Sequence, residues 1–374
     1  NLSKIFVNNS KLTFRNNFYY YNRDINITAN FFSGRQLYSF NELSYLINNK
    51  NHKTVIGVNF IADNFKDKGD ASNSYSYNRS TVGVFAQDEW QIDSRFLLQL
   101  GLRIDYNNEF NFSFLPHLSL MYKLTTDIQL RLTGSSGYRI PDIFNITDQR
   151  DFVKHNIDLS PDIKKENANS LNFDFSYKLV IAEFVFKLNQ AFFFTNVKNA
   201  VIPNYYSDGE APVIIDNSNS SLTTKGFDTN ILLAIDELEL FADYSYVDVN
   251  KTLNNVTSPL ELTPKNKVNL TLTYEEEDKT SGKKEWRAGL EAFYTGKQYL
   301  PNGNYSRSYW LLGAMFEKMF DGFSVILNIE NILDERQTKY EKIVSEPYDN
   351  PVFRPLYMPI DGVVANIAVW VKLQ

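Results

Sequence analysis

Apolar and polar side chains alternate with a period of two along most of this chain. The segment from residue 96 shows it well, with apolar Phe96, Leu98, Leu100, Leu102, Ile104 and Tyr106 separated by Gln99, Gly101, Arg103 and Asp105. Successive side chains of a β-strand point to opposite faces, so the pattern predicts strands with one apolar and one polar face. No helical periodicity of useful length competes with it.

The alternation predicts about 16 strands, each close to the length that a tilted strand needs to cross a bilayer. Their ranges are residues 11–20, 35–48, 54–65, 80–92, 96–106, 115–124, 128–138, 168–179, 182–195, 223–235, 238–249, 265–275, 285–296, 309–320, 323–333 and 362–373. A run of about 18 apolar residues, which a transmembrane helix would need, does not occur in the sequence.

The connections between these segments alternate between long and short. Tight turns are expected at Asp321-Gly322, Asp236-Glu237, Val180-Ile181 and residues 125–127, whereas residues 139–167, 196–222, 250–264 and 334–361 form long connections. Short periplasmic turns and long extracellular loops are typical of outer-membrane barrels. A soluble β-sandwich has no reason to keep this parity through so many hairpins.

A sheet can cross hydrocarbon only if it closes, because an unpaired backbone N–H or C=O group is too costly there. The sequence therefore predicts an all-β, antiparallel transmembrane β-barrel that forms one domain over residues 1–374, with its C-terminus in the periplasm. The expected location is the outer membrane of a Gram-negative bacterium, with lipids around the apolar face. The polar face would line a lumen that holds water or contacts a polar plug.

Composition refines this prediction. Aromatic residues make up 15% of the chain, and Trp90, Trp286 and Trp310 fall near strand ends, as girdle residues at a membrane interface do. Trp370 lies in the polar register and fits this pattern less well. The formal charge of −6 argues against a nucleic-acid partner, and the absence of Cys excludes disulfides and thiolate sites.

Five motifs in order resemble those of TonB-dependent outer-membrane receptors, and the resemblance covers roughly residues 82–374. They are Gly83–Trp90 with Leu100–Asp105, Gly137–Pro141 continuing to Asn145, Lys225–Asp228, Leu262–Val268 and Asn328–Asp334. The composition, rich in Asn, Lys and aromatic residues, also looks like that of Bacteroidetes sequences.

The resemblance implies active import of a scarce nutrient, such as an iron-siderophore, haem, cobalamin or a glycan. It implies a barrel of about 22 strands, a plug domain and coupling to the TonB complex. This chain would then be a C-terminal fragment without the plug and the first strands. A surface lipoprotein is a further partner that the resemblance allows. No cofactor is implied.

Ligand contacts are expected at the extracellular rim, where aromatic rings can stack on a ligand and Arg can pair with an anionic chelate. The candidates are Tyr138, Arg139, Tyr205, Tyr206, Tyr299, Tyr305, Arg307 and Tyr309. Girdle or loop packing is the simpler interpretation for any one of these tyrosines. Contacts to a plug are assigned to Arg103, Arg131, Glu291 and Glu330, with cross-strand charge pairing as the alternative.

The sequence offers two alternative functions. A hydrolase could use His117 and Ser119, which share a face of one strand, but no third partner or oxyanion donor is identifiable, so Pro116 is expected simply to open a strand. His52 and His155 are isolated, and neither a metal site nor a catalytic residue is expected. A passive porin with about 16 strands remains the main alternative to a receptor.

Overall fold

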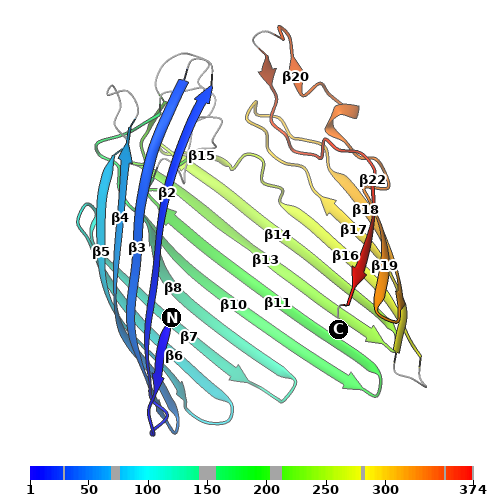
Figure 1. Cartoon of the computed structure of the whole chain (residues 1–374), viewed down its shortest axis with the longest axis horizontal. Helices are drawn as coiled ribbons and strands as arrows, with labels where there is room; N and C mark the ends of the chain where they lie inside the picture. The colour runs from blue at the N-terminus through cyan, green and yellow to red at the C-terminus, as the bar shows by residue number, and fades with distance from the viewer. Residues whose placement is uncertain are drawn as a thin grey trace.

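The computed structural model describes residues 1–27, 30–68, 76–142, 157–202, 213–278, 283–348 and 351–372. Its main element is an antiparallel sheet of 18 strands. The sheet curves into a wall in which each long strand pairs with the next, from β2 to β22 (Figure 1). Within the described residues no helix is long and apolar enough to cross a membrane.

The strands of the first half are β1 (Leu2–Ile5), β2 (Lys11–Ile27), β3 (Asn30–Asn49), β4 (His52–Asp67), β5 (Tyr77–Gln91), β6 (Phe96–Asn107), β7 (Asn111–Lys123), β8 (Ile128–Arg139) and β10 (Glu166–Ile181). Those of the second half are β11 (Phe184–Lys198), β13 (Ser220–Ile235), β14 (Leu238–Leu253), β15 (Val256–Pro259), β16 (Asn266–Asp278), β17 (Lys283–Thr295), β18 (Tyr309–Phe320), β19 (Phe323–Glu330) and β22 (Val364–Val371). Outside this sheet lie β9 (Ile157–Leu159) with β12 (Val213–Ile215), and β20 (Val344–Ser345) with β21 (Val352–Phe353). A 3-10 helix, η1, spans Gln337–Lys339.

Each of the 16 predicted segments overlaps one strand of this sheet, although β19 and β22, with eight residues each, are shorter than predicted. The two additional strands, β1 and β15, are short pieces of four residues each. The earliest segment is longer than expected, because β2 runs on to Ile27. The two-residue turn expected at Val180-Ile181 was wrong: both residues belong to β10, and the turn is Ala182-Glu183. Ala182 has a φ of 51°, a conformation that alanine rarely adopts, so the residue types gave no sign of it.

The two faces of the wall separate as the alternation predicts. Large apolar side chains such as Val84, Leu102, Leu118 and Phe173 remain exposed on the outer face. The inner face carries buried polar side chains, among them Asn59, Thr81, Asp105, Ser113 and Ser119. The apolar surface thus faces outward, where lipid would cover it, and the hydrogen-bonding groups face the concave side.

Close packing on the inner face leaves no room for a side chain at Gly83 or at Gly226. A Cβ atom at Gly83 would lie 2.1 Å from Asn59 Oδ1 and 2.2 Å from Asp105 Oδ1. A Cβ atom at Gly226 would lie 2.0 Å from the backbone oxygen of Tyr246 on the neighbouring strand. Any side chain at these positions would therefore displace a neighbour.

Pro116 has a different role from the one expected. It lies inside β7, which begins at Asn111, and does not open the strand. The β7–β8 ladder ends at the pair His117–Ser135, directly beside it. Proline has no N–H to donate, which fits the end of the β7–β8 ladder at this point, and residues 111–116 of β7 pair with β6 but not with β8.

Candidate functional site

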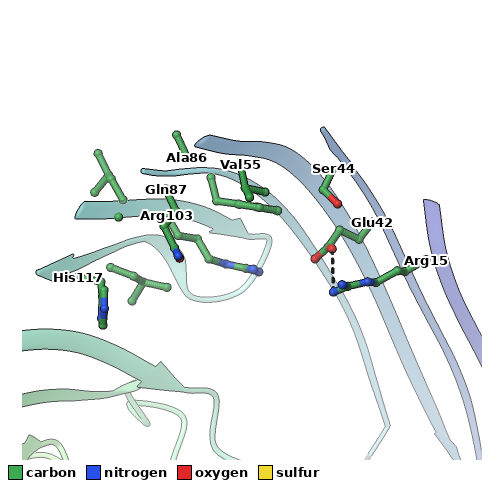
Figure 2. A pocket seen from close by; sticks show the side chains of 12 residues that line it. Arg15, Glu42, Ser44, Val55, Ala86, Gln87, Arg103 and His117 are labelled. Atoms are coloured by element: carbon green, nitrogen blue, oxygen red, sulfur yellow. Dashed lines mark hydrogen bonds and ion pairs between the residues drawn. The ribbon is translucent and has the colours of Figure 1, made fainter. Parts of the chain in front are cut away.

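A hollow of about 340 Å³ lies on the inner face of β2 to β7 (Figure 2). Its polar lining includes Arg15, Glu42, Gln87, Arg103 and His117. Arg15 and Glu42 are register partners and form an ion pair of 3.4 Å. Cross-strand pairing therefore satisfies part of the charge, while Gln87 and His117 present further polar groups in the same hollow.

The gap between β7 and β8 is bridged by side chains. The hydroxyl of Tyr138 donates a hydrogen bond to Asp105 on β6, with an oxygen–oxygen distance of 2.9 Å. Asp105 also accepts from Arg103, at 2.8 Å. Lys165 donates to the backbone oxygen of Phe112 and to Ser113 Oγ. These contacts replace the backbone ladder that Pro116 interrupts.

A second polar network fixes the chain as it leaves β8. Tyr77 donates to Asp142 with an oxygen–oxygen distance of 3.0 Å, and Arg79 donates to the backbone oxygen of Pro141 at 3.1 Å. The Arg79 guanidinium lies 4.3 Å from the centre of the Tyr77 ring and also pairs with Glu109 at 2.7 Å. Residues 141–142 are thus held against β5, three strands away from β8.

Two ring contacts lie near the point where β17 ends and β18 begins. The rings of Tyr299 and Tyr305 lie 5.5 Å apart in an edge-on arrangement. The Arg307 guanidinium lies 4.2 Å from the centre of the Tyr340 ring. We call these four residues the aromatic platform. It brings together residues from two connections that are distant in the sequence.

The long connection between β19 and β22 forms a compact loop around Gln337, which is fully buried. Its side-chain nitrogen donates to the backbone oxygen of Pro355 at 2.9 Å, and its side-chain oxygen accepts from the backbone nitrogen of Tyr357 at 3.0 Å. Gln298 joins this loop to the platform by donating to the backbone oxygen of Tyr357, at 2.9 Å. The loop is therefore a folded unit that is hydrogen-bonded to the segment carrying Tyr299.

Two ionisable groups of this loop have pKa values shifted by their neighbours. Burial, with a hydrogen bond to Glu341, raises the pKa of Tyr357 to about 12. Hydrogen bonding and proximity to Lys339 and Arg336 hold the pKa of Asp334 below its usual value. Both shifts favour the forms that these groups already have at neutral pH, a neutral Tyr357 and an ionised Asp334.

Replacing Gln337 with Ala should release this loop from its folded form. A buried hydrogen-bonding group that loses its partner costs about 1–3 kcal/mol, and Gln337 satisfies several such groups. We expect faster cleavage between residues 331 and 361 when intact cells carrying the Q337A variant are exposed to trypsin. Arg354→Ala, which removes an exposed ion pair of 3.2 Å in the same loop, should leave the cleavage rate almost unchanged. Equal rates for the two variants would contradict the central role of Gln337.

The structure places the candidate rim residues in two groups. Tyr299, Tyr305 and Arg307 belong to the aromatic platform, and Tyr309 begins β18 beside it. Tyr138 bonds to Asp105 and Arg139 pairs with Glu166, so both have intramolecular partners. Tyr205 and Tyr206 lie outside the described residues.

Among the candidate plug contacts, Arg103 lines the hollow of Figure 2. Arg131 contacts the sulfur of Met121 at 3.5 Å. Glu291 and Glu330 are exposed. The sequence did not single out Tyr77, Arg79, Asp142, Gln337 or Tyr340, although Pro141 and Asp142 lie within or next to a motif that it identified.

Catalytic and metal chemistry find little support in the geometry. Ser119 forms its hydrogen bond with Thr133, at 2.9 Å, and His117 lies opposite Ser135 and Gly101. Over the ranges that the structure describes, no group of three or more His, Cys, Asp or Glu side chains could hold a metal ion.

A curved antiparallel wall with an apolar outer face and a polar inner face is typical of a transmembrane β-barrel. Residues 2–332 match the family model described as TonB dependent receptor-like, beta-barrel. The chain therefore belongs to the TonB-dependent receptor β-barrel family, and its place is the outer membrane of a Gram-negative bacterium.

A curated relative is the iron-regulated outer membrane virulence protein of Vibrio cholerae, which is 25% identical over 272 residues. That match covers 68% of this chain but 40% of the relative, so the chain spans well under half of the relative's length. The relative's name refers to iron, and its location is the outer membrane.

Solved structures show the same fold. The siderophore receptor PirA of Acinetobacter baumannii superposes with a TM-score of 0.65 at 15% identity, covering 87% of this chain and 56% of that one. The ferric-catecholate import receptor Fiu of E. coli gives a TM-score of 0.64 at 12% identity, covering 96% and 61%. The family and the fold are those of receptors and transporters, not of enzymes.

Proposed function

We propose that this chain forms the barrel wall of a receptor that imports a ferric siderophore across the outer membrane, with energy supplied through TonB. The observation that carries the proposal is the family match over residues 2–332. Further support comes from relatives whose names refer to iron regulation, siderophores and ferric catecholates. The Bacteroidetes origin that the composition suggested has no such support.

The aromatic platform offers suitable chemistry for capturing such a ligand. Tyr305 is 57% exposed, so its ring is free to stack on a flat ligand ring. Arg307 lies on the Tyr340 ring and presents a cation, which attracts an anionic chelate. The Tyr340 hydroxyl donates to Glu335 at 2.9 Å, which holds the ring in place.

The inner face would then contact a plug domain. Arg103, Arg131, Glu291 and Glu330 are the proposed contacts, because charged groups on a wet lumenal wall can pair with a polar partner. TonB would act through that plug, and a surface lipoprotein would cover the extracellular opening. A passive porin should by contrast conduct ions steadily in planar bilayers, whereas a receptor whose lumen is filled should not.

Uptake of radioactive iron tests the proposed function directly. A strain without the gene that encodes this chain should lose growth and ⁵⁵Fe uptake under iron starvation with one class among catecholate, hydroxamate and carboxylate siderophores. Complementation should restore both, and a strain without TonB should behave like the deletion strain. Uptake that is unchanged for all three classes would contradict the proposal.

Substituting the platform should weaken ligand capture without affecting assembly. For Arg307→Ala we expect at least about tenfold weaker binding of the transported ferric chelate to whole cells, because a charge-assisted hydrogen bond contributes about 1.5–3 kcal/mol. Arg354→Ala is the matched control, since its arginine lies in the neighbouring loop and pairs with Glu341. Equal affinities of the two variants would remove Arg307 from the ligand site.

A further inference from the structure

A second hollow, of about 450 Å³, lies on the inner face at the periplasmic ends of β8, β10, β11, β13 and β14. Its polar lining includes Gln129, Ser176, Lys178, Lys187, Asn189 and Asn230. It lies near the turn between β10 and β11, well away from the extracellular platform.

Two lysines stand directly opposite each other in this hollow. Lys178 on β10 and Lys187 on β11 are register partners. Residues paired in this way have Cβ atoms about 4.5–5.5 Å apart, and like charges at such positions repel each other. Both side chains are exposed, and within the described part of the chain neither forms an ion pair.

Other register pairs on the inner face have opposite charges. Arg15 pairs with Glu42 at 3.4 Å, Lys53 with Glu89 at 3.0 Å, and Arg287 with Glu317 at 2.7 Å. Complementary charge is thus repeatedly used across this wall. The lysine pair departs from that arrangement and leaves two positive charges without a carboxylate between them.

The surroundings of the lysines favour hydrogen bonding to an oxyanion. Asn189 and Ser176 are fixed by their mutual hydrogen bond of 2.9 Å, and Asn230 and Gln129 add further amide groups. The lining contains one carboxylate, that of Asp127, which accepts from Thr126 at 3.1 Å. Two ammonium groups outweigh this single negative charge.

We propose that Lys178 and Lys187 form a binding site for an anionic group with at least two charged oxygens, such as a phosphate or a dicarboxylate. The two ammonium groups bind it from adjacent strands, and the amides complete its hydrogen bonds. A free solute and an acidic side chain of a protein segment in the lumen share this chemistry. The site is separate from the platform and does not depend on which nutrient is imported.

Lysine acylation on the purified full chain in detergent measures the occupancy of this site. Peptide mass spectrometry would follow the rate at which N-hydroxysuccinimidyl acetate modifies each lysine. The rates would be compared in chloride, inorganic phosphate and citrate at equal ionic strength. We expect phosphate or citrate to slow the modification of Lys178 and Lys187 together by about tenfold, as a charge-assisted contact would. Lys198, on β11 opposite Asn167 and Ser221, is the internal control and should not respond.

Single variants complete the test. In Lys178→Ala the added anion should no longer protect Lys187, and in Lys187→Ala it should no longer protect Lys178.

If both lysines of the unmodified chain resist acylation without added anion, and either variant makes the remaining lysine reactive, an acidic group of the protein occupies the site. If the rates in phosphate and citrate equal those in chloride, and both lysines react as fast as Lys198, the proposal is wrong. The result is independent of iron uptake, so it can fail while the proposed function stands.

Discussion

Replacing Gly226 with Val is expected to prevent assembly of the barrel almost completely. The backbone oxygen of Tyr246 lies 2.0 Å from where even a single Cβ atom would be, and a backbone atom in a paired strand cannot move aside without breaking its ladder. Overpacking a well-packed interior destabilises the folded protein by about 1–3 kcal/mol. A clash with a strand backbone should cost at least the upper value of this range.

The measurement is the amount of folded protein in the outer-membrane fraction, read from the mobility shift that heating causes in denaturing gels. Gly134→Val serves as the matched control, because no atom lies within 4 Å of a Cβ atom at Gly134, which is also a strand glycine. Wild-type amounts of the Gly226 variant would show that β13 and β14 do not approach each other as described. Loss of both variants would point instead to a general intolerance of valine at strand glycines.

Replacing Leu290 with Arg should destabilise the folded protein by about 2–4 kcal/mol, the cost of a cation on the lipid face near the bilayer centre. Leu290 lies near the middle of β17 and is 58% exposed on the apolar face. Unfolding by urea in lipid vesicles, followed by tryptophan fluorescence, would give the free energy of unfolding.

Glu291→Arg provides a closely matched control, since the neighbouring side chain points to the inner face and an arginine there remains in a polar environment. Its cost should lie well below that of the Leu290 variant. If both substitutions cost the same, or if the larger cost belongs to Glu291, the assignment of the two faces is reversed or the wall does not contact lipid.

Period-two alternation located the strands because each strand of a membrane sheet carries its own apolar face. That face is visible in the sequence of the strand itself. The apolar face of β6, for example, can be recognised from Leu98, Leu100 and Leu102 without knowledge of its neighbours. Tight turns with typical residues, such as Asp321-Gly322, were equally readable. The turn at Ala182-Glu183 was displaced in the prediction because neither residue is a usual turn former.

The candidate site was predicted less well, because its contacts join segments that are far apart in the sequence. The partner of Tyr138 is Asp105, 33 residues earlier and two strands away, and no local pattern indicates that pair. Gln337 is fully buried within loop 334–361 by contacts made up to 21 residues away, which no local pattern indicates. Arg307 was identified as a rim residue, but its neighbour Tyr340 was not.

The unequal lengths of the strands determine which part of the protein antibodies or phages would meet at the cell surface. β3 has 20 residues and β2 has 17, whereas β19 and β22 have eight each. A tilted strand of about 9–11 residues already spans the bilayer, so β2 and β3 rise far beyond it on one side of the molecule. Antibodies or phages that approach the cell would meet there a stiff, hydrogen-bonded ribbon. Such an epitope would be built on paired strand backbone, which an irregular surface loop does not offer.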